Sequence, residues 1–143
     1  MMIVCNAEEA YTAEEAYTAV KSLCDKAYDA ARVSTGVTRE TLLARSYALD
    51  SALWFIGGII DNDNRAQLRW TMLFFCTAEE AYTAVKSLCD KAYDAARVST
   101  GVTRETLLAR TYALCSALWY IGGIKNNDNR AQSQGTTMPA IPE

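Results

Sequence analysis

The chain of 143 residues contains no histidine. Histidine is the side chain whose ordinary pKa lies near neutral pH. It is the general base of Ser/His and Cys/His hydrolases and a ligand in most catalytic zinc sites. Its absence removes those enzyme classes from consideration. No other constellation of catalytic or cofactor-binding side chains stands out, so we expect a protein that is not an enzyme and uses no cofactor.

Positive charge is scarce as well. Lys and Arg number 14 and Asp and Glu number 17, which gives a formal net charge of −3 and a pI near 5.0. A protein that binds nucleic acid needs an electropositive face for the phosphates, so we expect no direct binding of nucleic acid. Half of the residues are hydrophobic, which is enough for one compact core and argues against a disordered chain.

Long apolar runs are missing too. The best candidate, Tyr47 to Ile60, covers only 14 residues and includes Asp50, whereas a membrane-spanning helix needs about 20 apolar residues. The opening residues MMIVCNAEEA lack the basic start and the long apolar stretch of a secretory signal. We therefore expect a cytoplasmic protein that does not associate with membranes. In that setting the five cysteines are expected to be free thiols.

The spacing of the cysteines argues against a metal site. Cys76 and Cys89 are 13 positions apart, about 20 Å along a continuous helix, whereas the ligands of one zinc ion lie about 2.3 Å from it. A site that also used Cys5 and Cys24 would require a break in the chain. The stretch Asp61–Asn64 lacks the glycine and the distant glutamate of a calcium loop and favours a turn with a helix cap. We expect no bound metal.

What the sequence does contain is a repeat at two scales. Residues Thr12 to Gln67 recur as Thr77 to Gln132 with a constant offset of 65, and the aligned positions differ at only five. The differing pairs are Ser46/Thr111, Asp50/Cys115, Phe55/Tyr120, Ile60/Lys125 and Asp61/Asn126. Upstream the offset is 71, because the six residues EEAYTA occur twice in the first copy. We interpret the six as a local duplication without a function of its own, and the large copy as recent or artificial.

The repeat defines the expected domain organisation. Residues 1–71 hold the first repeat with its insertion and residues 72–132 hold the second, and together they should form one compact domain. Residues 133–143, from Ser133, contain both prolines and no periodicity, and they are expected to form a disordered tail. The joint NDNRAQLRWTMLFFC favours a helix that continues into the second copy. The alternative is that MLFFC is an extended segment paired with MIVC.

Two helices are expected in each copy. In the second copy, apolar residues recur at steps of three and four over Ala81–Ala95, which is the pattern of a helix with one buried face. Cys89, like Cys24 in the first copy, lies on this face and is expected to be a buried thiol. Gly101 is expected to adopt the left-handed conformation at the following turn, and Thr103 to cap the next helix.

The second helix of each copy is apolar over more than half of its circumference. One line holds Leu107, Leu114, Leu118 and Ile121, and the adjacent line holds Leu108, Tyr112, Cys115 and Trp119. Such a helix needs more than one neighbour, which two hairpins supply. The sequence therefore predicts an all-α fold: two tandem helical hairpins packed as a pseudo-twofold four-helix bundle, with Arg39 to Ile60 and Arg104 to Ile124 in the centre. The pairs Gly57–Gly58 and Gly122–Gly123 are interpreted as helix stops.

The aromatic residues of the central helices and the joint are expected in the core and between the copies, because no basic groove accompanies them. They are Trp54, Phe55, Trp70, Phe74, Phe75, Trp119 and Tyr120. Asp50, which aligns with Cys115, is expected at the edge of the core near solvent, because an unpaired buried carboxylate is costly.

One candidate binding surface is acidic and consists of Glu8, Glu9, Glu14, Glu15, Glu79 and Glu80. These residues can bind a basic partner, or they can form solvated first turns that favour the helix dipole. Our leading expectation is a non-enzymatic helical module for protein–protein interaction or self-assembly. The alternative is a small acidic inhibitor of a nucleic-acid enzyme, of the anti-CRISPR or antitoxin type. A third hypothesis is a membrane-active small toxin, based on the apolar runs around Trp54 and Phe74.

Overall fold

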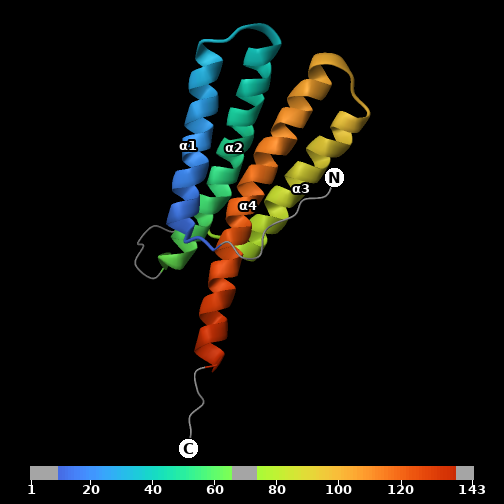
Figure 1. Ribbon diagram of the computed structural model, residues 1–143. Coiled ribbons are helices and arrows are strands. Elements are labelled where there is room, and N and C mark those ends of the chain that lie inside the picture. Colours follow the sequence, from blue (N-terminus) through green and yellow to red (C-terminus); the bar gives the residue numbers. More distant parts are fainter. Residues whose placement is uncertain (1–9, 66–73, 138–143) are drawn as a thin grey trace, which may run out of the picture.

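The chain folds into two helical hairpins (Figure 1). The computed structural model describes residues 10–65 and 74–137, the last of these, 131–137, by their backbone alone. In the first hairpin α1 spans Ala13–Arg32 and α2 spans Gly36–Asp63, and in the second α3 spans Ala78–Arg97 and α4 spans Gly101–Thr137. No strand occurs in these ranges, and the prediction of an all-α fold is confirmed.

The helices pack around a central pair. Helices α2 and α4 lie side by side and run in the same direction, with α1 and α3 on the outside and both hairpin turns at one end (Figure 1). Each outer helix also contacts the central helix of the opposite hairpin. The predicted pseudo-twofold packing of two tandem hairpins is therefore confirmed.

Each outer helix begins with the same capping box. The Thr12 hydroxyl accepts a hydrogen bond from the Glu15 N–H at 3.1 Å, and the Glu15 carboxylate accepts one from the Thr12 N–H at 2.9 Å. Thr77 and Glu80 repeat the arrangement at the same distances. These bonds satisfy N–H groups that have no partner inside a helix, and they fix where α1 and α3 start.

Removal of a capping threonine should weaken the fold. Thr77→Ala is expected to lower the free energy of unfolding by about 1 kcal/mol, because the Glu80 N–H loses its acceptor. Urea unfolding followed by circular dichroism measures the change. Thr83→Ala removes an exposed threonine inside the same helix and serves as the control, since it should cost nothing. Equal losses in both variants would mean that the cap has no special role.

One glycine allows each hairpin turn. Gly36 and Gly101 have φ angles of 62° and 63°, in the left-handed region that other residues rarely adopt. The prediction for Gly101 is confirmed. The prediction that Thr103 caps α4 is wrong, because the Arg104 N–H already donates to the Thr100 carbonyl at 3.4 Å and Thr103 lies inside the first turn.

The central helices continue through their glycine pairs, so the interpretation of these pairs as helix stops is wrong. The glycines instead allow close approach: a Cβ at Gly58 would lie 2.6 Å from the Phe74 ring and 3.0 Å from the Cys76 sulfur. Helix α4 also includes residues 133–137, so the predicted disordered tail from Ser133 is wrong for these residues. Residues 138–143 lie outside the described residues.

The joint does not continue as a helix into the second copy. Helix α2 ends at Asp63, where the Asn64 side chain donates to the Ile60 carbonyl at 3.0 Å, and residues 74–77 are not helical. The Cys76 N–H donates to the Gly58 carbonyl of α2 at 3.2 Å. In a continuous helix it would instead donate to the carbonyl four residues earlier in the chain. The predicted continuous helix is therefore wrong for residues 74–77, whereas residues 66–73 and MIVC lie outside the described residues.

The segment before each outer helix crosses to the central helix of the opposite hairpin. The Cys76 N–H donates to Gly58 of α2, and the Tyr11 N–H donates to the Gly123 carbonyl of α4 at 3.0 Å. The two hydrogen bonds are equivalent, because Tyr11 and Cys76, like Gly58 and Gly123, are separated by the repeat offset of 65. Upstream of the six-residue duplication, however, the residue that aligns with Cys76 is Cys5. The duplication has therefore placed a tyrosine where the other half of the bundle has a cysteine.

The Tyr11 side chain packs on α4. Its ring lies 5.1 Å from the ring of Tyr120, and its hydroxyl accepts a hydrogen bond from Trp119 Nε1 at 3.3 Å. On the other half, Phe74 stacks on Trp54 with ring centroids 5.3 Å apart. The predicted contact of aromatic residues between the copies is confirmed at Phe74, but Trp54 is 62% exposed and so does not belong to the core.

The core between the hairpins is aliphatic. Its centre holds most of the predicted inner lines of α2 and α4, namely Leu49, Leu53, Ile56, Leu114, Leu118 and Ile121. Leu107, predicted on the same line of α4, is only half-buried and does not belong to this core. Asp50 is exposed and Cys115 is half-buried, which confirms that this position lies at the edge of the core. The core thus has aliphatic contacts at its centre and polar or thiol groups at its margin.

Candidate functional site

Two grooves with matching residues lie on the bundle, and we call them the twin grooves. The first has a volume of about 230 Å³ and is bounded by both helices of the first hairpin and by α4 of the second. The first hairpin contributes Leu23, Lys26, Ala27, Leu42, Arg45 and Leu49. Helix α4 contributes Ala113 and Ser116.

The second groove repeats the first at the offset of the repeat. Its volume is about 300 Å³, and the second hairpin contributes Leu88, Lys91, Ala92, Leu107, Arg110 and Leu114. Helix α2 contributes Ala48 and Ser51. None of the five positions at which the copies differ lies in a groove. Because each groove takes residues from both hairpins, the pair exists only when the two repeats pack together.

The lining of each groove is mainly apolar. Leu49 and Leu114 are buried and form the floor, whereas Leu23 and Leu88 remain 36% and 38% exposed at the side. An exposed leucine beside a buried one offers a surface that a further apolar side chain can cover.

Two cations lie beside the apolar lining of each groove. Lys26 and Arg45 of the first groove are exposed, as are Lys91 and Arg110 of the second. Within the described ranges, none of these four forms an ion pair. The neighbouring Lys21, by contrast, lies 3.4 Å from the Asp25 carboxylate. The groove cations therefore remain available to an anionic group.

Of the six acidic residues singled out in the sequence, the structure describes four, and three of these four have intramolecular partners. Glu15 and Glu80 complete the capping boxes, and Glu79 lies 3.0 Å from the Lys125 ammonium. Glu14 is exposed in the first turn of α1, and Glu8 and Glu9 lie outside the described residues. Helices α1 and α3 make no contact with each other in the described part of the chain, so their acidic starts do not adjoin. An acidic binding face stays a prediction.

The aligned aspartates Asp63 and Asp128 have perturbed pKa values. Partial desolvation raises the pKa of the exposed Asp63, and the negative charges of Asp128 and Glu14 raise it further. Partial desolvation also raises the pKa of Asp128, which is exposed too. A carboxyl whose pKa is raised by folding destabilises the fold when ionised, and this cost disappears as the pH falls through the folded pKa.

No group of three or more His, Cys, Asp or Glu among the described residues could hold a metal ion.

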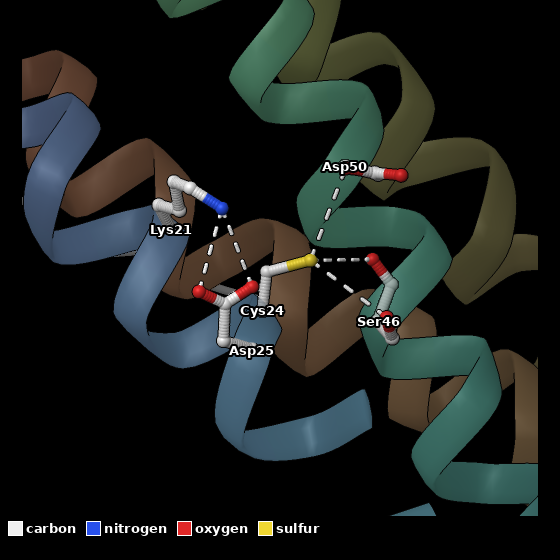
Figure 2. Close-up of polar contacts among 5 residues, drawn as sticks. All are labelled: Lys21, Cys24, Asp25, Ser46 and Asp50. Carbon is white, nitrogen blue, oxygen red and sulfur yellow. Dashed lines mark hydrogen bonds and ion pairs between the residues drawn. The ribbon is translucent and has the colours of Figure 1, made fainter. Parts of the chain in front are cut away.

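Cys24 and Cys89 are buried thiols, as predicted. Cys24 donates to the Ser46 carbonyl at 3.4 Å and to the Asp50 carboxylate at 3.9 Å (Figure 2). Burial raises the pKa of Cys24 above its usual value and raises that of Cys89 to about 12. Burial therefore outweighs the nearby lysines, and neither thiol is an activated nucleophile.

Helix α4 has the length and composition of a membrane span over Gly101–Arg130. Half of its most apolar window is buried against the rest of the bundle. A central helix with several neighbours has the same apolar composition, so this feature is weak evidence for a membrane span.

Comparison of the chain with known protein families, with curated proteins and with solved structures gives no match. The function must therefore be inferred from the geometry of the bundle and its twin grooves.

Proposed function

We propose that the chain is a non-enzymatic protein-binding module whose twin grooves each bind an acidic amphipathic helix of a protein partner. The proposal rests on the two grooves being lined by aligned residues of the two repeats, each groove with an apolar floor and two cations. Two matching sites related by a pseudo-twofold axis suit a partner that offers the same segment twice, such as a symmetric dimer. Simultaneous binding at both sites raises the overall affinity through effective concentration.

The size of the grooves favours side chains as occupants. Volumes of about 230 and 300 Å³ lie at or below the low end of small-molecule pockets, which is roughly 300–1,000 Å³. An amphipathic helix laid in a groove presents apolar side chains at i, i+3, i+4 and i+7, and one or two of them fill such a space.

The charge of the grooves selects an acidic helix. Arg45 and Arg110 can each hold a carboxylate through two parallel hydrogen bonds, and Lys26 and Lys91 add a second positive charge. The chain as a whole is acidic, so these positive sites are local features of a negative surface. Their attraction for a carboxylate should weaken with salt.

Binding of a model peptide tests the proposal. The probe is a fluorescein-labelled amphipathic helix of about 18 residues, with leucines at i, i+3, i+4 and i+7 and glutamates on the polar face. Calorimetry should give two peptides per chain. Arg45→Glu and Arg110→Glu should each weaken one site by roughly tenfold or more, because a carboxylate then faces a carboxylate.

Arg104→Glu makes the same charge change at an exposed position of α4 outside both grooves, and it should leave both sites intact. The proposal is contradicted if only one peptide binds, if Arg104→Glu weakens binding equally, or if a peptide with lysines in place of glutamates binds as tightly. Self-association that disappears in the Arg45→Glu/Arg110→Glu double variant would assign the grooves to a second copy of the chain. Binding of duplex DNA or RNA in preference to the peptide would also contradict the proposal.

A further inference from the structure

We propose that Cys89 and Cys115 form a reversible disulfide that joins α3 to α4 and has no counterpart in the first hairpin. Their sulfur atoms lie 3.5 Å apart on neighbouring helices. Position 115 is one of the five at which the repeats differ, and the aligned residue is Asp50. The paired thiols are therefore particular to the second hairpin.

The geometry of the two hairpins supports the pairing. In the first hairpin the Cys24 sulfur lies 3.9 Å from the Asp50 carboxylate, so the same two helix positions face each other there (Figure 2). In the second hairpin the partner atom is a sulfur, and a disulfide of about 2.05 Å requires the two atoms to approach by about 1.5 Å. The sulfur of Cys76, by contrast, donates to the Phe55 carbonyl at 3.2 Å.

The two thiols differ in access to solvent, which sets the order of events. Cys115 is half-buried at the edge of the core, whereas Cys89 is 0% exposed. An oxidant in solution therefore meets Cys115 first. Cys89, held against it, is placed to attack the product of that first reaction.

Oxidised glutathione is a suitable oxidant, because it reacts by thiol–disulfide exchange. The Cys115 thiolate attacks one of its sulfurs, which forms a mixed disulfide and releases one glutathione thiolate. Cys89 loses its proton to solvent and attacks the Cys115 sulfur, which releases the second glutathione thiolate. Two electrons thus pass from the protein dithiol to glutathione disulfide. The two protons lost by the protein thiols are equal in number to those that convert the two released thiolates to glutathione thiols.

The rate of this reaction should increase with pH. Burial raises the pKa of Cys89 to about 12, with the hydrogen bond to Cys115 as the next cause, so the thiolate is scarce at neutral pH. Closure of the disulfide should therefore be slow near neutral pH and faster in alkali.

Counting of free thiols tests the inference. The reduced full-length chain is incubated with oxidised glutathione, quenched with acid, denatured, alkylated with N-ethylmaleimide and measured by intact-mass spectrometry. Of the five cysteines, two should escape alkylation, and a cross-linked peptide should join Cys89 to Cys115. Dithiothreitol should restore both thiols.

The repeat supplies matched variants. Cys115→Asp places in the second hairpin the residue that the first hairpin holds, and it should abolish the loss of thiols, as should Cys115→Ser. Asp50→Cys should protect two further thiols through a disulfide from Cys24 to the new thiol. Full alkylation of the oxidised native chain, a glutathione adduct that persists on Cys115, or a cross-link between other cysteines would overturn the proposal. A Cys89–Cys115 cross-link that forms equally well in urea would also overturn it, since the folded geometry would then have no part in the pairing.

Discussion

Leu118→Ala is expected to lower the free energy of unfolding by about 2–5 kcal/mol, the range for truncation of a fully buried leucine. Leu118 is 0% exposed and belongs to the core that the central helices share. The loss has two parts: the favourable free energy of burying the removed carbon atoms is no longer gained, and a cavity remains in the core. Its aligned residue Leu53 is 8% exposed, so Leu53→Ala should cost less than Leu118→Ala. Urea unfolding under reducing conditions measures the free energies of unfolding of the two variants and of the native chain.

Asp50→Cys is the matched control for the leucine variants. It introduces the residue that the second copy already carries at this position, and Asp50 is exposed, so the stability should be nearly unchanged in reducing buffer. Harmless leucine variants together with a large effect of Asp50→Cys would reject the assignment of an inner and an outer line on the central helices.

Gly58→Ala is expected to destabilise the bundle by about 1–3 kcal/mol through overpacking. The added methyl group would lie 2.6 Å from the Phe74 ring and 3.0 Å from the Cys76 sulfur, so both residues would have to move away from α2. That movement would disturb the hydrogen bond from the Cys76 N–H to the Gly58 carbonyl, which holds Cys76 on α2. Thermal and urea unfolding measure the change.

Gly57→Ala is the neighbouring control, since its added methyl group would lie 3.9 Å from the Tyr17 ring, an ordinary contact distance. Alanine is favoured over glycine inside a helix by about 1 kcal/mol, so this variant should be neutral or more stable than the native chain. If both variants were stabilising, the close approach of Phe74 and Cys76 to α2 would be refuted.

The helices and their pairing were predictable because the signals are local and periodic. The apolar steps over Ala81–Ala95 and the wide apolar surface of α4 follow from residues three and four positions apart. The ends of the central helices were not predictable in the same way. Two adjacent glycines usually end a helix. Here Gly58 and Gly123 stay inside the helices because the rings of Phe74 and Tyr11 pack directly against them and leave no room for a Cβ. Neither ring is a near neighbour of its glycine in the sequence, so this contact could not be predicted.

The twin grooves could not be predicted from the sequence of one copy. The first groove joins Leu49 of one hairpin to Ala113 of the other, and that contact depends on how the repeats pack. A partial signal was available, because Lys26 and Arg45 and the leucines near them recur unchanged in the second copy. The glutamate pairs are more conspicuous in the sequence, but the structure shows that Glu15 and Glu80 cap helices.

The near-identity of the two hairpins also governs how separate chains can meet. The surfaces that pack α2 on α4 differ little between the copies, so the first hairpin of one chain can pair with the second hairpin of another. Closure within one chain is favoured by the joint, which keeps the hairpins at an effective concentration of the order of millimolar. We expect the closed monomer at far lower protein concentrations and, near this effective concentration, an exchange of hairpins that links chains head to tail. We therefore expect that the covalent link between the two hairpins keeps the exchange of hairpins between chains rare at low protein concentration.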